Sequence, residues 1–300
     1  MEKVMSRKLI TISTIMTLMS TSVIADVPNV AADIAPIHSL VSRVMDGVGA
    51  PKLIVQSGAS PHGYRLRPSE AKALQDADHV FWIGEELTPW LNSAIDTLAT
   101  KASVTTLLDQ EGVVLHNFRE GALFEAHDHS AHDDDDKDHD DHDDHDDDKD
   151  HDDHDDHDDD KDHDDHDDHD DDKDHDDHGS HDPHAWLSPE NAKLWLNIIA
   201  SKLSVSDPEN AATYFMNAAA GQAEIEEMIA EVSATLKPVQ GNKFVVFHDA
   251  YQYFENDFDF YASGAISLSD VSDPSPARIE KIQKRIRDEG IQCVLAEPQF

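Results

Sequence analysis

The chain has 300 residues, of which 64 are acidic and 23 are Lys or Arg, and its formal net charge at pH 7 is −41. Such an acidic chain lacks the basic surface that releases counterions from DNA or RNA, which argues against nucleic-acid binding. A polytopic membrane protein is excluded as well, because the one long apolar run lies at the extreme N-terminus.

That apolar run has the parts of a secretory signal peptide. Basic residues at Lys3, Arg7 and Lys8 precede an apolar stretch over residues 9–24, and small or branched residues come before a cleavage site expected after Ala25. The alternative is an N-terminal membrane anchor, although the stretch is short and contains several Thr and Ser. We therefore expect the mature chain to be exported.

Most of the negative charge comes from residues 127–182, here called the His/Asp-rich tract. The tract holds 33 Asp, 15 His and 4 Lys, so it contributes −29 of the net charge, and its lysines recur every 12 residues. Its single apolar residue, Ala131, cannot offset the entropy of ordering the segment. We expect the tract to be disordered without a ligand and to separate two parts of ordinary globular composition.

Before the tract, the pattern predicts a parallel α/β unit. A short buried strand is expected at Lys52–Val55, a helix that begins with proline at Pro68–Ala77, and a second strand at Val80–Gly84. Strand, helix and strand in this order are typical of a parallel sheet.

After the tract, proline again marks the starts of helices. Ser188 and Pro189 open one helix, and Asp207 and Pro208 open a second that runs to about Pro238, roughly 45 Å and long enough to link two lobes. A strand at Phe244–Phe247, a helix over Pro276–Glu289 and a terminal strand complete the pattern. The sequence thus predicts an α/β fold of two lobes joined by one long helix.

Three histidines outside the tract have similar settings. His62 follows the first strand by a short loop, His184 lies just before a helix, and His248 comes at the end of a strand. The carboxyl ends of parallel strands carry the ligand sites of open α/β sheets, and neutral imidazoles suit Zn2+. We therefore expect these three side chains to form a zinc site.

Four ordered motifs carry a resemblance to a known family. They are Gly58–Tyr64 with Arg67–Ser69, Asp182–Pro189, Phe247–Tyr251 with Tyr253–Phe254, and Ala296–Phe300. In this order they resemble the metal-binding solute-binding proteins of bacterial ABC importers, most closely the zinc-uptake (ZnuA-type) branch.

The resemblance implies a periplasmic receptor, two Rossmann-like lobes on one rigid helix with Zn2+ in the cleft between them. It places the metal ligands at His62, His184 and His248; a histidine at the third position is typical of the zinc branch, where the manganese branch has Glu. It further implies that the protein is a monomer and that it is not an enzyme. Its expected partners are an inner-membrane ABC permease and the ATPase of that permease, to which it delivers zinc. The expected divisions are a signal peptide 1–25, an N-terminal lobe 26–126, the tract 127–182, the end of that lobe 183–206, a linking helix 207–238 and a C-terminal lobe 239–300.

Some family features are missing from this sequence. Pro61 stands where some zinc members have an acidic fourth ligand, so the fourth position stays open to water or to a residue beyond Phe300. Cys293 matches the first half of a family disulfide whose second half is absent, and it is either unpaired because the chain stops early or a small buried hydrophobic residue. We expect the C-terminal lobe to be incomplete.

The role of the tract and the roles of several other residues have more than one interpretation. The tract is a zinc scavenger or sensor, an acidic spacer or, because Asp133–Lys137 looks like a cleavable epitope, an engineered tag. A periplasmic zinc store acting mainly through the tract is the alternative function. Among other residues, we expect a structural or supporting role for His38, an exposed position for His79, and support of His248 by Asp249.

Overall fold

The computed structural model describes residues 27–119, 123–124, 181–267 and 273–297. The expected signal peptide and nearly all of the His/Asp-rich tract lie outside these residues. No helix within the described part of the chain combines the length and apolar character needed to cross a membrane. The chain divides into two compact units: unit 1 contains the residues up to Val114 and Pro183–Pro238, and unit 2 contains Leu115–Asp182 and the residues from Val239 to Pro298.

Unit 1 is built on a parallel sheet of four strands. The strands are β1 (Val30–Ala32), β2 (Lys52–Leu53), β3 (His79–Trp82) and β4 (Ser103–Thr106), in the spatial order β2-β1-β3-β4. The two strands predicted from the apolar runs are confirmed as β2 and β3, and the parallel arrangement is confirmed too.

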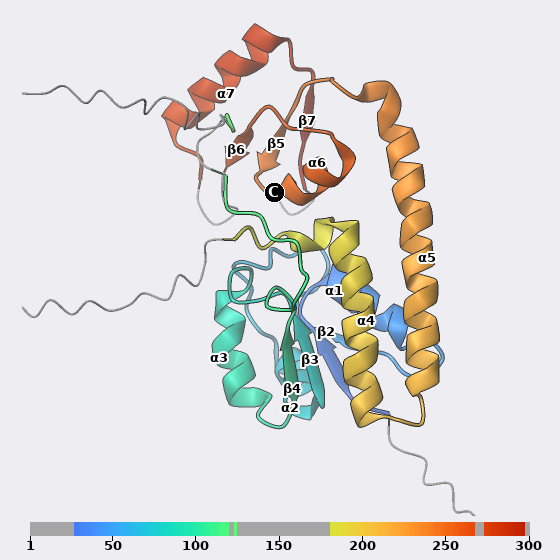
Figure 1. The fold of residues 1–300 in the computed structure, drawn as a ribbon. Helices are drawn as coiled ribbons and strands as arrows, with labels where there is room; N and C mark the ends of the chain where they lie inside the picture. The colour runs from blue at the N-terminus through green and yellow to red at the C-terminus, as the bar shows by residue number, and fades with distance from the viewer. Residues whose placement is uncertain (1–26, 120–122, 125–180, 268–272, 298–300) are drawn as a thin grey trace, which may run out of the picture. The chain divides into compact units, whose positions relative to one another are not determined.

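Helices cover both faces of this sheet (Figure 1). On one face lie α2 (Pro68–Asp76) and α3 (Pro89–Leu98), packed in one core cluster with Val80 and Trp82. On the other lie α1 (Ala35–Val44), α4 (Pro189–Ser206) and α5 (Ala211–Leu236). Side chains alternate between the two faces of a strand, so both cores are built from the same short strands.

The long helix α5 begins later than the sequence predicts. Asp207 ends α4 as its C-cap, and its buried carboxylate accepts hydrogen bonds from the hydroxyl of Tyr214 and the side-chain amide of Asn210, each at 2.7 Å. Because these contacts hold residues 208–210 in a turn, the 26-residue helix starts at Ala211. The chain enters unit 2 directly after α5 and the short 3-10 helix Lys237–Val239, which makes α5 the helix that joins the two units.

Unit 2 has a smaller parallel sheet. The strand β5 (Phe244–His248) lies between β6 (Ala265–Ser267) and β7 (Cys293–Leu295), and the helices are α6 (Gln252–Phe258) and α7 (Pro276–Glu289). Phe244, Val246 and Ala265 form its apolar core. The predicted bounds of α7 are confirmed, as are the predicted strands at β5 and β7.

One expectation about burial is wrong, and one of the two alternatives for Cys293 is excluded. Cys293 is an exposed free thiol on the outer strand β7, so it is not a buried hydrophobic residue. His79 is 5% exposed rather than open to solvent, because its Nε2 lies 2.7 Å from the hydroxyl of Ser206. Burial lowers the pKa of the His79 imidazole.

Candidate metal centre

His62 lies in the loop between β2 and α2, and two side chains hold this loop in place. The indole Nε1 of Trp90, on α3, donates a 2.7 Å hydrogen bond to the carbonyl of Pro61. The hydroxyl of Ser60 accepts a 3.3 Å bond from the backbone N–H of His62 itself. These two hydrogen bonds hold the backbone of Pro61 and His62 in place. They thereby fix the position from which the His62 side chain extends.

The far end of the loop is anchored on α2. Glu70 is 4% exposed, and its carboxylate accepts hydrogen bonds from the hydroxyl of Tyr64 and the backbone N–H of Arg67, both at 2.7 Å. The second of these bonds also satisfies the first turn of the helix, as in a capping box. A buried carboxylate thus couples the start of α2 to the segment that carries His62.

His184 is fixed by the start of α4. It directly precedes the 3-10 helix Ala185–Leu187, and the hydroxyl of Ser188 then caps α4 by accepting from the N–H of Asn191. The buried side-chain amide of Asn191 donates to the carbonyl of Ala185 at 3.1 Å. The N-cap predicted at Ser188 is confirmed, and it places the 4% exposed His184 at the helix entrance.

Unit 1 brings His62 and His184 together. Their ring centroids are 5.6 Å apart with the rings tilted by 58°, and the indole of Trp186 lies edge-on to His184 at 5.2 Å. Two imidazoles at this separation provide two nitrogen donors on one face of the unit, the arrangement that a borderline-soft cation such as Zn2+ prefers.

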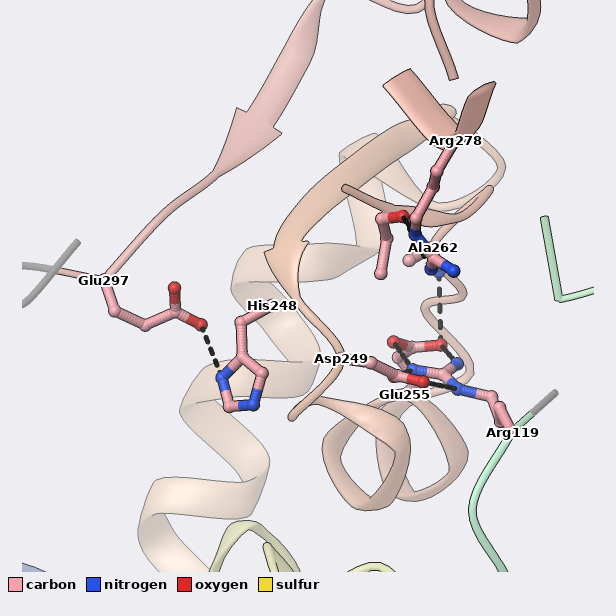
Figure 2. Close-up of polar contacts among 8 residues, drawn as sticks. Arg119, His248, Asp249, Glu255, Ala262, Arg278 and Glu297 are labelled. Carbon is pink, nitrogen blue, oxygen red and sulfur yellow. Dashed lines mark hydrogen bonds and ion pairs between the residues drawn. The ribbon is translucent and has the colours of Figure 1, made fainter. Parts of the chain in front are cut away.

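His248 is the last residue of β5 in unit 2, where its strand register pairs it with Ser267. It is 5% exposed, and its Nδ1 lies 3.8 Å from the carboxylate oxygen Oε1 of Glu297 (Figure 2). Tyr251 hydrogen-bonds the same carboxylate, and the pKa of its hydroxyl is raised by burial first and then by Glu297. With the carboxylate on the Nδ1 side of the ring, Nε2 is the ring nitrogen that is suited to bind a metal.

The expected support of His248 by Asp249 takes a different form. The Asp249 carboxylate is bound by the guanidinium of Arg119, and the Figure 2 close-up shows it turned toward Arg119. Burial raises the pKa of the Asp249 carboxyl, while the hydrogen bonds from Arg119 oppose that rise. The carboxylate that contacts the His248 ring in Figure 2 is that of Glu297.

Sequence reasoning did not single out Glu297, which contacts His248, or Arg119, which binds Asp249. The sequence could have indicated Glu297, because it follows the strand β7 and so lies at the carboxyl end of a parallel strand. His248 was singled out by the same kind of position. His38 has a structural role, as its Nε2 lies 3.2 Å from the carbonyl of Pro51.

Comparisons with known proteins agree on one family. The family model described as the periplasmic zinc-uptake complex component A, ZnuA, matches residues 30–300. The high-affinity zinc uptake system protein ZnuA of Brucella abortus is 48% identical over 271 residues, which cover 90% of this chain and 77% of that protein. The protein of the same name from Paracoccus denitrificans is 45% identical over 273 residues, covering 91% and 77%.

Solved structures share the fold at lower identity. A crystal structure of ZnuA superposes with a TM-score of 0.65 at 19% identity, covering 91% of this chain and 83% of that one. The laminin-binding adhesin of Streptococcus agalactiae gives a TM-score of 0.63 at 20% identity, covering 91% and 81%. The expected fold of two α/β units joined by a long helix is thereby confirmed.

Proposed function

Because this chain belongs to the ZnuA family of periplasmic zinc-uptake components, we propose that it is the receptor that captures Zn2+ and hands it to an ABC permease and its ATPase. Proteins of this family are transport components and not enzymes, and they bind Zn2+ as the transported ligand. We further propose that residues 1–25 are the signal peptide that exports the chain, and that it works as a monomer.

The proposed zinc ligands are His62, His184 and His248. The observation that carries this assignment is the paired imidazoles of His62 and His184 in unit 1. His248 is the proposed third ligand because a carboxylate lies on the Nδ1 side of its ring, as is usual for metal-binding imidazoles. Three neutral imidazoles favour Zn2+ over Mn2+, and they leave a fourth position for water or another donor.

For the His/Asp-rich tract we propose an accessory role, in which it collects zinc weakly near the receptor site. A segment with so little apolar surface pays an ordering cost whenever it binds, so its individual sites are weak and exchangeable. The alternative, a zinc store that acts mainly through the tract, places nearly all of the binding there.

Deleting residues 127–180 separates the two functions. The deletion should stop before His181 and Asp182, because the backbone N–H of Asp182 donates to the carbonyl of His116 at 2.7 Å and belongs to the folded part of unit 2. We expect isothermal titration of the deleted protein to give one tight Zn2+ site and much weaker Mn2+ binding. Loss of all tight binding would favour the store.

A transport assay extends this test to the membrane. Bacteria that lack their own zinc receptor should regain growth in zinc-poor medium when they carry the deletion variant, because the receptor site is sufficient for delivery. The matched control carries His62→Ala in the same background and should fail to grow. Equal growth with the two variants would contradict the receptor function.

A further inference from the structure

Unit 2 holds a partly buried arginine and two buried carboxylates beside His248. Arg119 donates from Nε to Asp249 at 3.0 Å and from Nη1 to Glu255 at 2.6 Å. The three side chains are 15%, 7% and 1% exposed in that order. Figure 2 shows the guanidinium of Arg119 reaching both carboxylates. Two carboxylates that are this deeply buried are stable as charged groups only when a cation binds both of them. The forked guanidinium of an arginine can bind two carboxylates at once.

Other contacts hold the guanidinium in this orientation. Its Cζ lies 3.7 Å from the centroid of the Phe124 ring, a cation–π contact. Glu255 also accepts a 3.3 Å hydrogen bond from the backbone N–H of Ala262. Arg119 therefore binds Asp249 from a fixed position.

The Asp249 side chain is attached to the turn that ends β5. The N–H of Asp249 donates to the carbonyl of Ser267 at 3.2 Å, and the N–H of Ala250 donates to the carbonyl of His248 at 3.0 Å. These bonds tie the main chain of His248 to the residue that Arg119 binds, while Glu297 contacts the imidazole ring from its other end. His248 is thus restrained at its backbone and at its ring by different side chains.

Arg119 lies on the segment that leads toward the His/Asp-rich tract, and that segment is anchored to α6. The hydroxyl of Tyr253 accepts from the N–H of His116 at 3.1 Å and donates to the carbonyl of Asp182 at 2.7 Å. The last residue of the tract and the segment before the tract are therefore both bonded to the helix that follows His248.

We propose that Arg119 is a positioning residue for the zinc ligand His248. It holds Asp249, and through Asp249 it fixes the backbone from which the His248 imidazole projects toward the metal. This inference rests on the proposed function, because it requires His248 to bind zinc. Residues that orient metal ligands in this way typically contribute about 10–100-fold to metal affinity.

The test uses the full chain and the variant Arg119→Met. Competition with a chromophoric chelator measures the tight zinc site, and the visible spectrum of one bound equivalent of Co2+ reports its geometry. We expect the variant to bind zinc about 10–100-fold more weakly and to show a changed cobalt spectrum. The control is Arg43→Met, which removes an arginine bound through two nitrogens to Glu224 in unit 1, and we expect it to leave both readouts unchanged.

A second variant separates positioning from general damage to the fold. This triple variant combines Arg119→Met with Asp249→Asn and Glu255→Gln, so that all three charges are removed together. The melting temperature of the metal-free protein should then return to that of the unaltered chain, while the zinc affinity should stay as low as in Arg119→Met. Recovery of both, or wild-type affinity and spectrum in Arg119→Met, would overturn the inference. Absence of a tight site in the unaltered chain would instead overturn the proposed function.

Discussion

Replacing His184 with alanine should abolish most of the tight zinc binding. A complete structural zinc site is worth about 10–16 kcal/mol, so the loss of one nitrogen donor costs on the order of 3 kcal/mol, or roughly 100-fold in affinity. The loss should be as large in His62→Ala and His248→Ala, since each contributes one donor. Titration calorimetry of the variants, made in the protein that lacks residues 127–180, measures the effect without interference from the tract.

The matched control for these variants is His38→Ala. His38 is also a partly buried histidine, but its Nε2 contacts the carbonyl of Pro51 and its Nδ1 lies 3.5 Å from the hydroxyl of Ser42. We expect this substitution to leave zinc affinity within a factor of about 3, since it changes α1 and no proposed ligand. If His38→Ala and His184→Ala weakened binding equally, the ligand assignment would be wrong.

A second large effect concerns stability, and it depends on pH through Asp33. This residue follows β1, is fully buried, and accepts hydrogen bonds from the N–H groups of Ile34 and Ile83, both at 2.7 Å. Burial raises the pKa of its carboxyl from 3.8 to about 7, against the opposing effect of the two backbone donors. Between about pH 4 and pH 7, Asp33 is therefore protonated in the folded protein and ionised in the unfolded chain.

The sign of the effect follows from this proton. Because the pKa is higher in the folded state, the contribution of Asp33 to the free energy of unfolding is greatest at low pH and is lost as the pH rises toward 7. Between pH 5 and pH 8 the loss should be roughly 2–3 kcal/mol relative to Asp33→Asn, at 1.36 kcal/mol for each pKa unit. Urea unfolding of the metal-free proteins at both pH values measures it.

The exposed Asp76→Asn serves as the control for this comparison, because its carboxylate pairs with Lys72 at the surface of α2. The difference between wild type and Asp76→Asn should stay nearly constant over the same pH range. A constant difference between wild type and Asp33→Asn as well would show that Asp33 titrates alike in the folded and the unfolded chain.

Local rules account for the parts of the fold that the sequence predicts well. The helices at Pro68, Pro189 and Pro276 begin where proline fixes the backbone angle of the first helical residue, and this depends on neighbouring residues only. The histidines could be singled out because each is close to a predicted strand or helix end. These are features that a few adjacent residues determine.

The predictions that failed depend on side-chain partners that local motifs do not show, and two of these pairs are far apart in the sequence. Arg119, which binds Asp249, is 130 positions away from it, and Ser206, which contacts His79, is 127 positions away. Asp207 looked like a helix start because Pro208 follows it, but its carboxylate is committed to Tyr214 in the packed structure. Side-chain partners of this kind become visible only once the elements are packed together.

The most direct test of the proposed receptor site is X-ray absorption at the zinc edge of the protein that lacks residues 127–180, loaded with one equivalent of Zn2+. We expect three imidazole nitrogens at about 2.0 Å and no sulfur ligand. The imidazole count should fall to two in His248→Ala. A spectrum with fewer than three imidazoles in the unaltered site, or one that does not change in His248→Ala, would contradict the assignment of His62, His184 and His248 as the zinc ligands.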